Sequence, residues 1–461
     1  TNKLSPLRIL SLSWGRRDVP VLTGAERVVQ GLSQGPMNRT FKPFVSAAVL
    51  AGAVAAIGCR GAPVISQDRE DVTRLVDSLR PAVEHAVGLR FTRAPVSSVR
   101  SREQVRAYLI HKLDAELPVG KARGLQEAYR LLGMFPDTVE LRPLLLDLLT
   151  EQIVGFYDPD SSMLFVVSGA DPAQLRVVVA HELVHALQHQ YVRLDSIMHQ
   201  TGDNDRLTAA QAVLEGQATL GGLQVMVPKQ NLFSMPEFWE TYREGVKAQQ
   251  SSMPVFARAP RVIREELIFP YLAGADFMRW WLGSERKDTV PFGRYMPTST
   301  EQILHPYRYG RNDQPLSVRF ADSGPKALYE DVLGELDIRI LLAELSGASE
   351  VNTPIAIGWG GDRYRLYESA GGAALLWVSV WDDIPSRFRF LNEAMGRLQA
   401  RRKLGYRLQE RSFEPAGHPA VRLLIAPEAG SGTDSPPESP LNHNSWPPAG
   451  TPEPPPQPWR L

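Results

Sequence analysis

The feature that most constrains this 461-residue sequence is an apolar helical segment that carries His181, Glu182 and His185. Apolar residues lie before, between and after these three positions, throughout residues 177–187. A helix that is apolar nearly all round is predicted to be buried. Buried histidine and glutamate side chains need polar partners, so the fold must place suitable groups around this segment.

The spacing of the two histidines indicates a metal site. Residues four apart on a helix share one face, so the imidazoles of His181 and His185 can bind one Zn²⁺ at about 2.0–2.1 Å. Glu182 turns toward the open coordination side, where it can take a proton from a bound water and pass it to a leaving amine. The alternative, a surface helix with two histidines, conflicts with the apolar surroundings. We therefore predict one zinc ion per chain, with Glu182 as catalytic base and acid.

A third metal ligand is predicted on the next helix, at residues 206–227. Glu215 lies in the middle of this segment, and the alternative is a glutamate at the exposed edge of the helix. His189 shares the face of the other histidines but lies about 12 Å along the axis from His181. One zinc cannot bind both, so His189 is expected at the cleft edge or in a structural role. Small residues on the Glu215 face allow close helix approach: Ala212, Ala218, Thr219 and Gly222.

Peptide hydrolysis also needs a hydrogen-bond donor for the developing oxyanion. Our candidate is His305, which follows the metal segment at a distance that allows return to the cleft. Its rivals are Tyr271, Tyr307 and Tyr309, and the alternative for His305 is a helix-end histidine that bonds local backbone. The predicted strand 163–167 is expected to bind substrate backbone by strand addition.

The metal-site residues resemble the zincin metallopeptidases of the gluzincin branch, in which two histidines and a glutamate on the next helix bind zinc. Residues 181–188 with 214–219 are similar to a group of largely uncharacterised bacterial metallopeptidases, and 299–306 and 358–364 extend the similarity. The resemblance implies a small sheet whose edge strand lines the cleft, an active-site helix below it and a helical lower half.

Three positions depart from the pattern of those families. Gln217 and His189 stand where the bacterial group has Asp. Thr219 stands near the position where many gluzincins have an Asp that orients one histidine. The resemblance therefore leaves open which residue orients the zinc ligands.

Periodicity and turn signals predict a mainly helical α+β fold. We expect a zincin-like catalytic domain at 67–312, a smaller α+β domain at 325–426, and a Pro-rich tail at 427–461 that cannot bury enough apolar surface to fold. Residues 358–362 are expected to form a tight turn. Helices are predicted at 68–89, 101–117, 121–132, 139–153, 172–191, 206–227, 236–247, 264–282, 297–303, 331–345 and 386–398. Strands are predicted at 152–157, 163–167, 362–367, 373–380, 402–409 and 421–426.

Cys59 is the single cysteine, so no intramolecular disulfide is possible. It follows a basic stretch at 37–42 and an uncharged, Ala- and Val-rich run at 43–58. This pattern resembles a bacterial lipoprotein signal peptide, with Ala56 where Leu is usual. The alternatives are a plain signal peptide, a membrane anchor, for which the run is short, or a buried helix.

We accordingly expect a signal peptide at 37–58, lipidation of Cys59 and a tether at 59–66. Because a targeting signal acts at a chain's N-terminus, residues 1–36 are expected to be upstream sequence wrongly joined to the protein.

The chain has 51 basic and 51 acidic residues, and this balance argues against a nucleic-acid partner or a broad anionic-membrane surface. The resemblance and the signal together imply a zinc-dependent peptidase of the bacterial cell envelope. It would be tethered through a lipid at Cys59, face away from the cytoplasm and act on a peptide or protein substrate. Two rival hypotheses are a catalytically inactive zincin scaffold that binds envelope partners, and a zinc hydrolase of a non-peptide amide.

Overall fold

The computed structural model describes residues 69–194, 197, 202–286, 289–320, 325–351, 354–369, 371–399 and 405–428. These residues belong to one compact unit. The predicted signal peptide, Cys59, the tether and the tail after 428 lie outside them. Within the described ranges, no helix combines the length and the apolar character that a membrane crossing requires.

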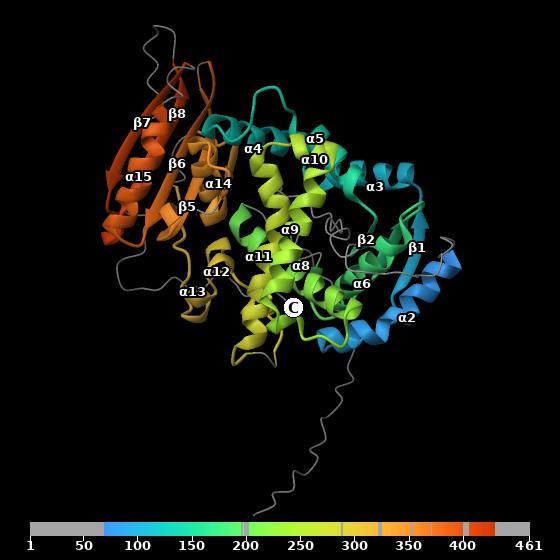
Figure 1. The fold of residues 1–461 in the computed structure, drawn as a ribbon. Coiled ribbons are helices and arrows are strands. Elements are labelled where there is room, and N and C mark those ends of the chain that lie inside the picture. Colours follow the sequence, from blue (N-terminus) through green and yellow to red (C-terminus); the bar gives the residue numbers. More distant parts are fainter. Residues whose placement is uncertain are drawn as a thin grey trace, which may run out of the picture. The chain divides into compact units, whose positions relative to one another are not determined.

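The fold is α+β and mainly helical, with two sheets, as the sequence predicts (Figure 1). Ser101 caps its helix in a capping box with Gln104, and Asp171 accepts from the backbone N–H of Ala173. The helix predicted at 139–153 begins at Leu141, after the cap residue Glu140, so its predicted start is wrong. Among the described residues before 311, the α-helices are α2 (Arg69–Val87), α3 (Arg102–Glu116), α4 (Val119–Leu132), α5 (Leu141–Gln152), α6 (Pro172–Gln188), α8 (Asn204–Met226), α9 (Pro236–Ser251), α10 (Pro254–Arg258), α11 (Arg261–Gly283), α12 (Thr300–Leu304) and α13 (Pro306–Gly310).

The first sheet contains β1 (Val96–Arg100), β2 (Gly155–Asp158) and β3 (Met163–Val167), in the order β1-β3-β2. Strands β2 and β3 form the predicted antiparallel hairpin, and β1 pairs with β3 in parallel. The expectation that β3 binds substrate backbone by strand addition is wrong, because both of its edges are already paired. The strand that lies at the edge beside α6 is β2.

The two faces of this sheet bury different side chains. Leu164 and Val166 pack against α2 and α6 in one apolar cluster. Phe156 and Phe165 belong to the main core on the other side, where Phe156 stacks on Tyr108 of α3 with 4.7 Å between ring centroids. Because successive side chains point to opposite faces, the sheet lies between α2 and α6 on one side and α3 on the other.

The second sheet is antiparallel, with the order β4-β5-β6-β8-β7. Phe390 of the neighbouring helix stacks on Trp381 and meets Trp377 edge-on. The tight turn predicted at 358–362 is wrong, because a strand begins at Trp359 and bulges before Gly361. The elements are β4 (Tyr329–Asp331), α14 (Gly334–Ser346), β5 (Trp359–Ser369), β6 (Gly372–Trp381), α15 (Ile384–Leu398), β7 (Tyr406–Phe413) and β8 (Ala420–Pro427).

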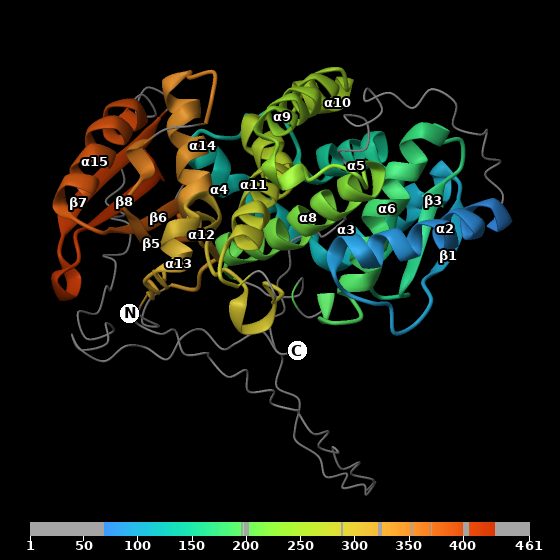
Figure 2. The same cartoon turned by 60° about the horizontal axis from the view of Figure 1, so that its bottom comes forward.

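Helix α8 lies between α6 and α11 (Figure 1, Figure 2). At the crossing with α11, a Cβ on Gly216 would lie 2.2 Å from the carbonyl oxygen of Gly274, and one on Gly274 would lie 2.0 Å from that of Ala212. Toward α6, a Cβ on Gly222 would lie 3.4 Å from the backbone of His181. Small residues on α8 therefore bring both neighbouring helices close to it.

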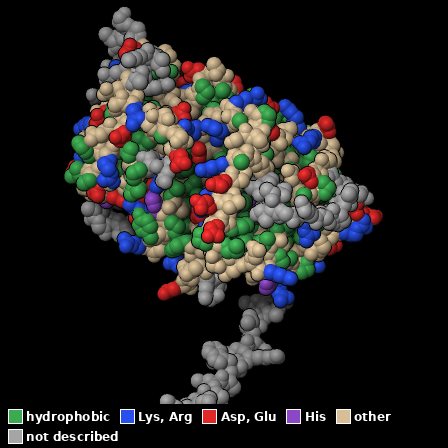
Figure 3. Space-filling view, in the orientation of Figure 1, with side chains coloured by type: hydrophobic (Ala, Val, Ile, Leu, Met, Phe, Trp, Pro, Cys, Tyr) green, Lys and Arg blue, Asp and Glu red, His purple; other side chains and the backbone are tan. Residues whose placement is uncertain are grey.

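Acidic and basic side chains are intermingled on the face of the molecule shown in Figure 3. Several opposite charges pair directly, such as Arg363 with Glu330 at 2.8 Å and Arg308 with Asp382 at 2.7 Å. Charged residues of opposite sign therefore lie beside one another in these pairs.

Candidate metal centre

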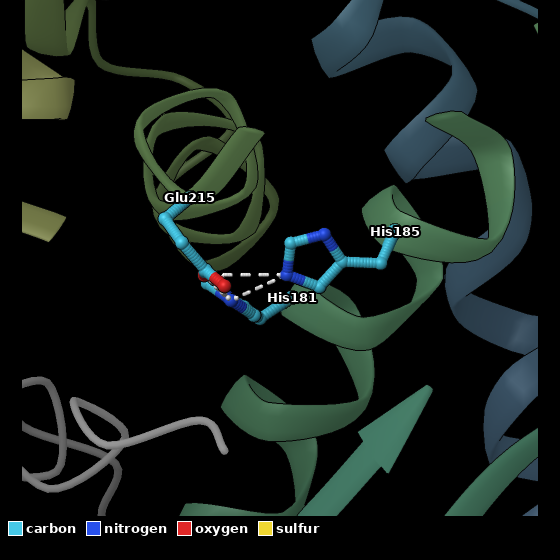
Figure 4. A group of neighbouring side chains, drawn as sticks. All are labelled: His181, His185 and Glu215. Atoms are coloured by element: carbon cyan, nitrogen blue, oxygen red, sulfur yellow. Dashed lines mark hydrogen bonds and ion pairs between the residues drawn. The ribbon is translucent and has the colours of Figure 1, made fainter. Parts of the chain in front are cut away.

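The three predicted zinc ligands meet in the structure. His181 and His185 lie one turn apart on α6, and Glu215 points at them from α8 (Figure 4). The Oε2 atom of Glu215 lies 3.0 Å from Nε2 of His181 and 3.3 Å from Nε2 of His185, and the two Nε2 atoms are 3.1 Å apart. Each residue offers a ligand atom within 4.8 Å of the others, and all three residues are buried. This cluster could hold a metal ion.

The three groups share charge in a buried environment. Burial opposes the charged form of His185, but the Glu215 carboxylate outweighs it and raises the pKa of His185 to about 9. Burial alone would raise the pKa of Glu215, yet the two histidines lower it to about 2. Burial lowers the pKa of His181. A proton on His185 therefore balances the charge of Glu215, and a metal cation bound there would replace that proton.

Glu182 is fully buried beside this cluster. Its Oε2 accepts a hydrogen bond of 2.8 Å from the backbone N–H of Tyr157 on the edge strand β2. Its Oε1 has no hydrogen-bond partner among the described residues. Burial raises the pKa of Glu182 to about 8, although the neighbouring His185 opposes the shift. The edge strand thus holds one carboxylate oxygen of Glu182 in place.

His189 contacts the edge strand rather than the cluster. Its Nδ1 lies 2.8 Å from the hydroxyl of Tyr157, and the two rings meet edge-on. Helix α6 therefore holds Tyr157 at two points, through Glu182 at the backbone and His189 at the hydroxyl. This placement fits the structural role expected for His189.

Gln188 is a residue to which the sequence analysis gave no role. It is fully buried, and its Oε1 lies 2.8 Å from Nδ1 of His185. Its Nε2 donates to the carbonyl of Leu214 and to Oε1 of Gln217. The signal that points to it is its position three residues after His185, which puts both on neighbouring parts of one helical face.

The candidates for the oxyanion donor lie in different places. The Tyr271 ring on α11 stacks near His181, with 6.0 Å between ring centroids, and the side chain is buried. The Nε2 atom of His305 lies 3.0 Å from Oε1 of Glu335 and 3.0 Å from a guanidinium nitrogen of Arg339, both on α14. Neither of these partners belongs to the metal cluster, so the geometry favours Tyr271 over His305.

The segment around His305 includes α12, which is hydrogen-bonded to α8 and α14. The backbone N–H of Thr300 donates to Asp205 on α8 at 3.0 Å, and its hydroxyl accepts from the N–H of Leu336 on α14 at 3.1 Å. Farther along, the hydroxyl of Tyr309 donates to the carbonyl of Tyr295. Residues 299–306 therefore form a structural junction between α8, α12 and α14.

Comparison with known proteins identifies only part of the chain. Residues 324–417 match a domain of unknown function (DUF8575). This match includes α14, α15 and most of the second sheet, and it begins close to the predicted domain start at 325. No curated protein and no solved structure matches the chain. The matched region does not contain His181, His185 or Glu215.

Proposed function

We propose that the chain is a zinc-dependent peptidase of gluzincin-like architecture. The observation that carries the proposal is the convergence of His181, His185 and Glu215 beside the buried carboxylate of Glu182. The packing of helix α6 further supports the zincin comparison. This helix carries His181, Glu182 and His185, and it packs against the small sheet, whose edge strand β2 contacts it.

The donor set suits zinc in particular. Two imidazole nitrogens and one carboxylate oxygen are a common ligand set of catalytic zinc, and three protein ligands leave one coordination position for a water or substrate. The three residues come from two helices whose separation is fixed by close packing at Gly222. His181, His185 and Glu215 would hold the metal.

Zinc at this position would supply a Lewis acid that polarises the scissile carbonyl and acidifies the attacking water. The ionised form of Glu182, which a cation bound beside it would favour, performs the proton transfers. Its Oε1 takes a proton from the water as the new C–O bond forms, and it gives that proton to the amine nitrogen as the C–N bond breaks. The hydrogen bond from Tyr157 to Oε2 keeps Glu182 in one orientation through both steps. Tyr271 is the proposed donor to the oxyanion.

The test of the metal site is zinc analysis of the purified protein. We expect one zinc per chain, and loss of most of it in Glu215→Ala. The matched control is Glu116→Ala, which removes a buried glutamate on α3 and should retain the metal. Unchanged zinc content in Glu215→Ala would exclude Glu215 as a ligand.

The test of catalysis is Glu182→Gln, which keeps the size of the side chain but removes its base. We expect retained zinc and no cleavage of a mixed peptide library, read by mass spectrometry. Continued cleavage by this variant would overturn the assigned role. A wild-type protein that binds zinc but cleaves no peptide would favour the inactive scaffold or the hydrolase of a non-peptide amide.

The proposed location is the bacterial envelope, with a lipid on Cys59. This part rests on the sequence pattern before Cys59. Expression of Cys59→Ser in a bacterial host should move the protein from the membrane to the soluble fraction. Unaltered membrane fractionation would instead favour an anchor formed by the apolar run.

A further inference from the structure

The carboxamide of Gln188 bridges the metal-site helix and the helix that carries the third ligand. Its Oε1 lies 2.8 Å from Nδ1 of His185, and its Nε2 lies 2.9 Å from the carbonyl oxygen of Leu214 and 3.0 Å from Oε1 of Gln217. Gln188 is 0% exposed and His185 1%. The buried carboxamide of Gln188 thus makes three hydrogen bonds. Its NH₂ group donates two of them, and its oxygen accepts the third.

The carbonyl of Leu214 determines which way this amide faces. A carbonyl oxygen can only accept, so the Gln188 atom beside it must be the NH₂ group. The opposite orientation would place two acceptors against each other, because Oε1 would then face the Leu214 oxygen. The oxygen of Gln188 therefore faces His185.

The orientation of Gln188 in turn selects the tautomer of His185. An amide oxygen accepts, so Nδ1 of His185 must carry the hydrogen. A neutral imidazole has only one N–H group, which leaves the lone pair on Nε2. Nε2 is the atom that lies 3.3 Å from Oε2 of Glu215 and 3.1 Å from Nε2 of His181.

We infer that Gln188 is a positioning residue that holds His185 in the tautomer whose Nε2 binds the metal. This inference rests on the proposed metal site. Metal-bound histidines commonly donate to a carboxylate, a backbone carbonyl or water, whereas this chain uses a neutral amide that Leu214 and Gln217 hold in place. Leu214, whose carbonyl orients Gln188, directly precedes Glu215. The orientation of His185 therefore depends on the position of the helix segment that carries Glu215.

The first test is Gln188→Leu, which removes the acceptor while keeping a similar side-chain volume. We expect the affinity for zinc, measured by competition with a chelator, to fall about 10–100-fold. The matched control is Gln126→Leu on α4. Gln126 is also buried, accepts from the N–H of Leu141 at 2.7 Å and contacts Glu140. This control should lower the Tm without changing zinc affinity. Wild-type zinc affinity in Gln188→Leu would overturn the inference.

The second test separates the contact with His185 from the link between the helices. In Gln188→Glu the carboxylate can still accept from Nδ1 of His185 but cannot donate to Leu214 or Gln217. We expect a lowered Tm with zinc affinity close to that of the wild type. A loss of affinity as large as that of Gln188→Leu would overturn the inference, because the helix link would then matter instead. This variant decides the question even where Gln188→Leu does not fold.

Failure of the proposed metal site can be distinguished from failure of the role of Gln188. If the wild-type chain binds no zinc, the metal site and the role of Gln188 fail together. If the wild type binds one zinc and loses it in Glu215→Ala, yet Gln188→Leu binds as tightly as the wild type, the role of Gln188 alone is refuted.

Discussion

Protonation of the proposed ligands is expected to make zinc binding depend on pH. The pKa of His185 is raised to about 9 by the neighbouring carboxylate of Glu215, so below pH 9 the imidazole carries a proton that a metal must displace. Zinc affinity should therefore rise with pH up to about 9, by about tenfold per unit for each proton released. Calorimetry at pH 7 in buffers of different ionisation enthalpy should show release of at least one proton. Binding heats that do not depend on the buffer would show that His185 is already neutral.

Tyr271 and His305 are the two candidates for the proposed oxyanion donor. Tyr271 lies beside His181, whereas His305 is occupied by Glu335 and Arg339. Tyr271→Phe should lower kcat by about 10²–10³, the usual effect of removing one such donor, with zinc content unchanged. His305→Gln should leave kcat within a few-fold of the wild type. The reverse ranking in steady-state kinetics would restore His305 as the donor.

The crossing of helices α8 and α11 positions both Glu215 and Tyr271. A Cβ on Gly274 would lie 2.0 Å from the carbonyl oxygen of Ala212, so Gly274→Ala must push the helices apart. We expect a loss of about 1–3 kcal/mol in the free energy of unfolding, with weaker zinc binding. The control is Gly283→Ala at the end of the same helix, where a Cβ meets open space. Equal effects of the two substitutions would show that the crossing does not position the site.

Elements defined by local signals were predictable from the sequence. Capping residues and apolar periodicity located most of the helices, and the histidine spacing identified the two candidate ligands on α6. Strand β1 was missed because it is short and pairs with β3, which lies far away along the chain. Because β1 was not predicted, β3 was wrongly expected to have a free edge that could bind substrate. Gln188 was missed because its role depends on the carbonyl of Leu214, which only the packed helices bring near it.

Buried polar contacts join the helices before residue 311 to the second sheet and α14. The hydroxyl of Tyr129 on α4 lies 2.9 Å from Asp337 of α14 and 2.6 Å from Glu266 of α11. The N–H of Asn204 at the start of α8 donates to Asp331 on β4 at 2.7 Å. Such contacts in a low-dielectric interior are costly to break singly, so these regions are expected to unfold together.

Calorimetry should accordingly show a single unfolding transition. Zinc should raise its Tm as a whole, because a ligand that binds only the native state stabilises everything that unfolds with the site. The Glu215→Ala variant should show no such rise. Two transitions, of which only one responds to zinc, would show that the predicted domains 67–312 and 325–426 are independent.

The most direct test of the whole account is to locate the metal. Crystals of the zinc-loaded wild-type protein, measured at energies on either side of the zinc absorption edge, should give one anomalous peak per chain. We expect this peak about 2.0–2.2 Å from Nε2 of His181, Nε2 of His185 and a carboxylate oxygen of Glu215. A zinc peak bound elsewhere, or no peak among these three side chains, would contradict the proposed metal centre.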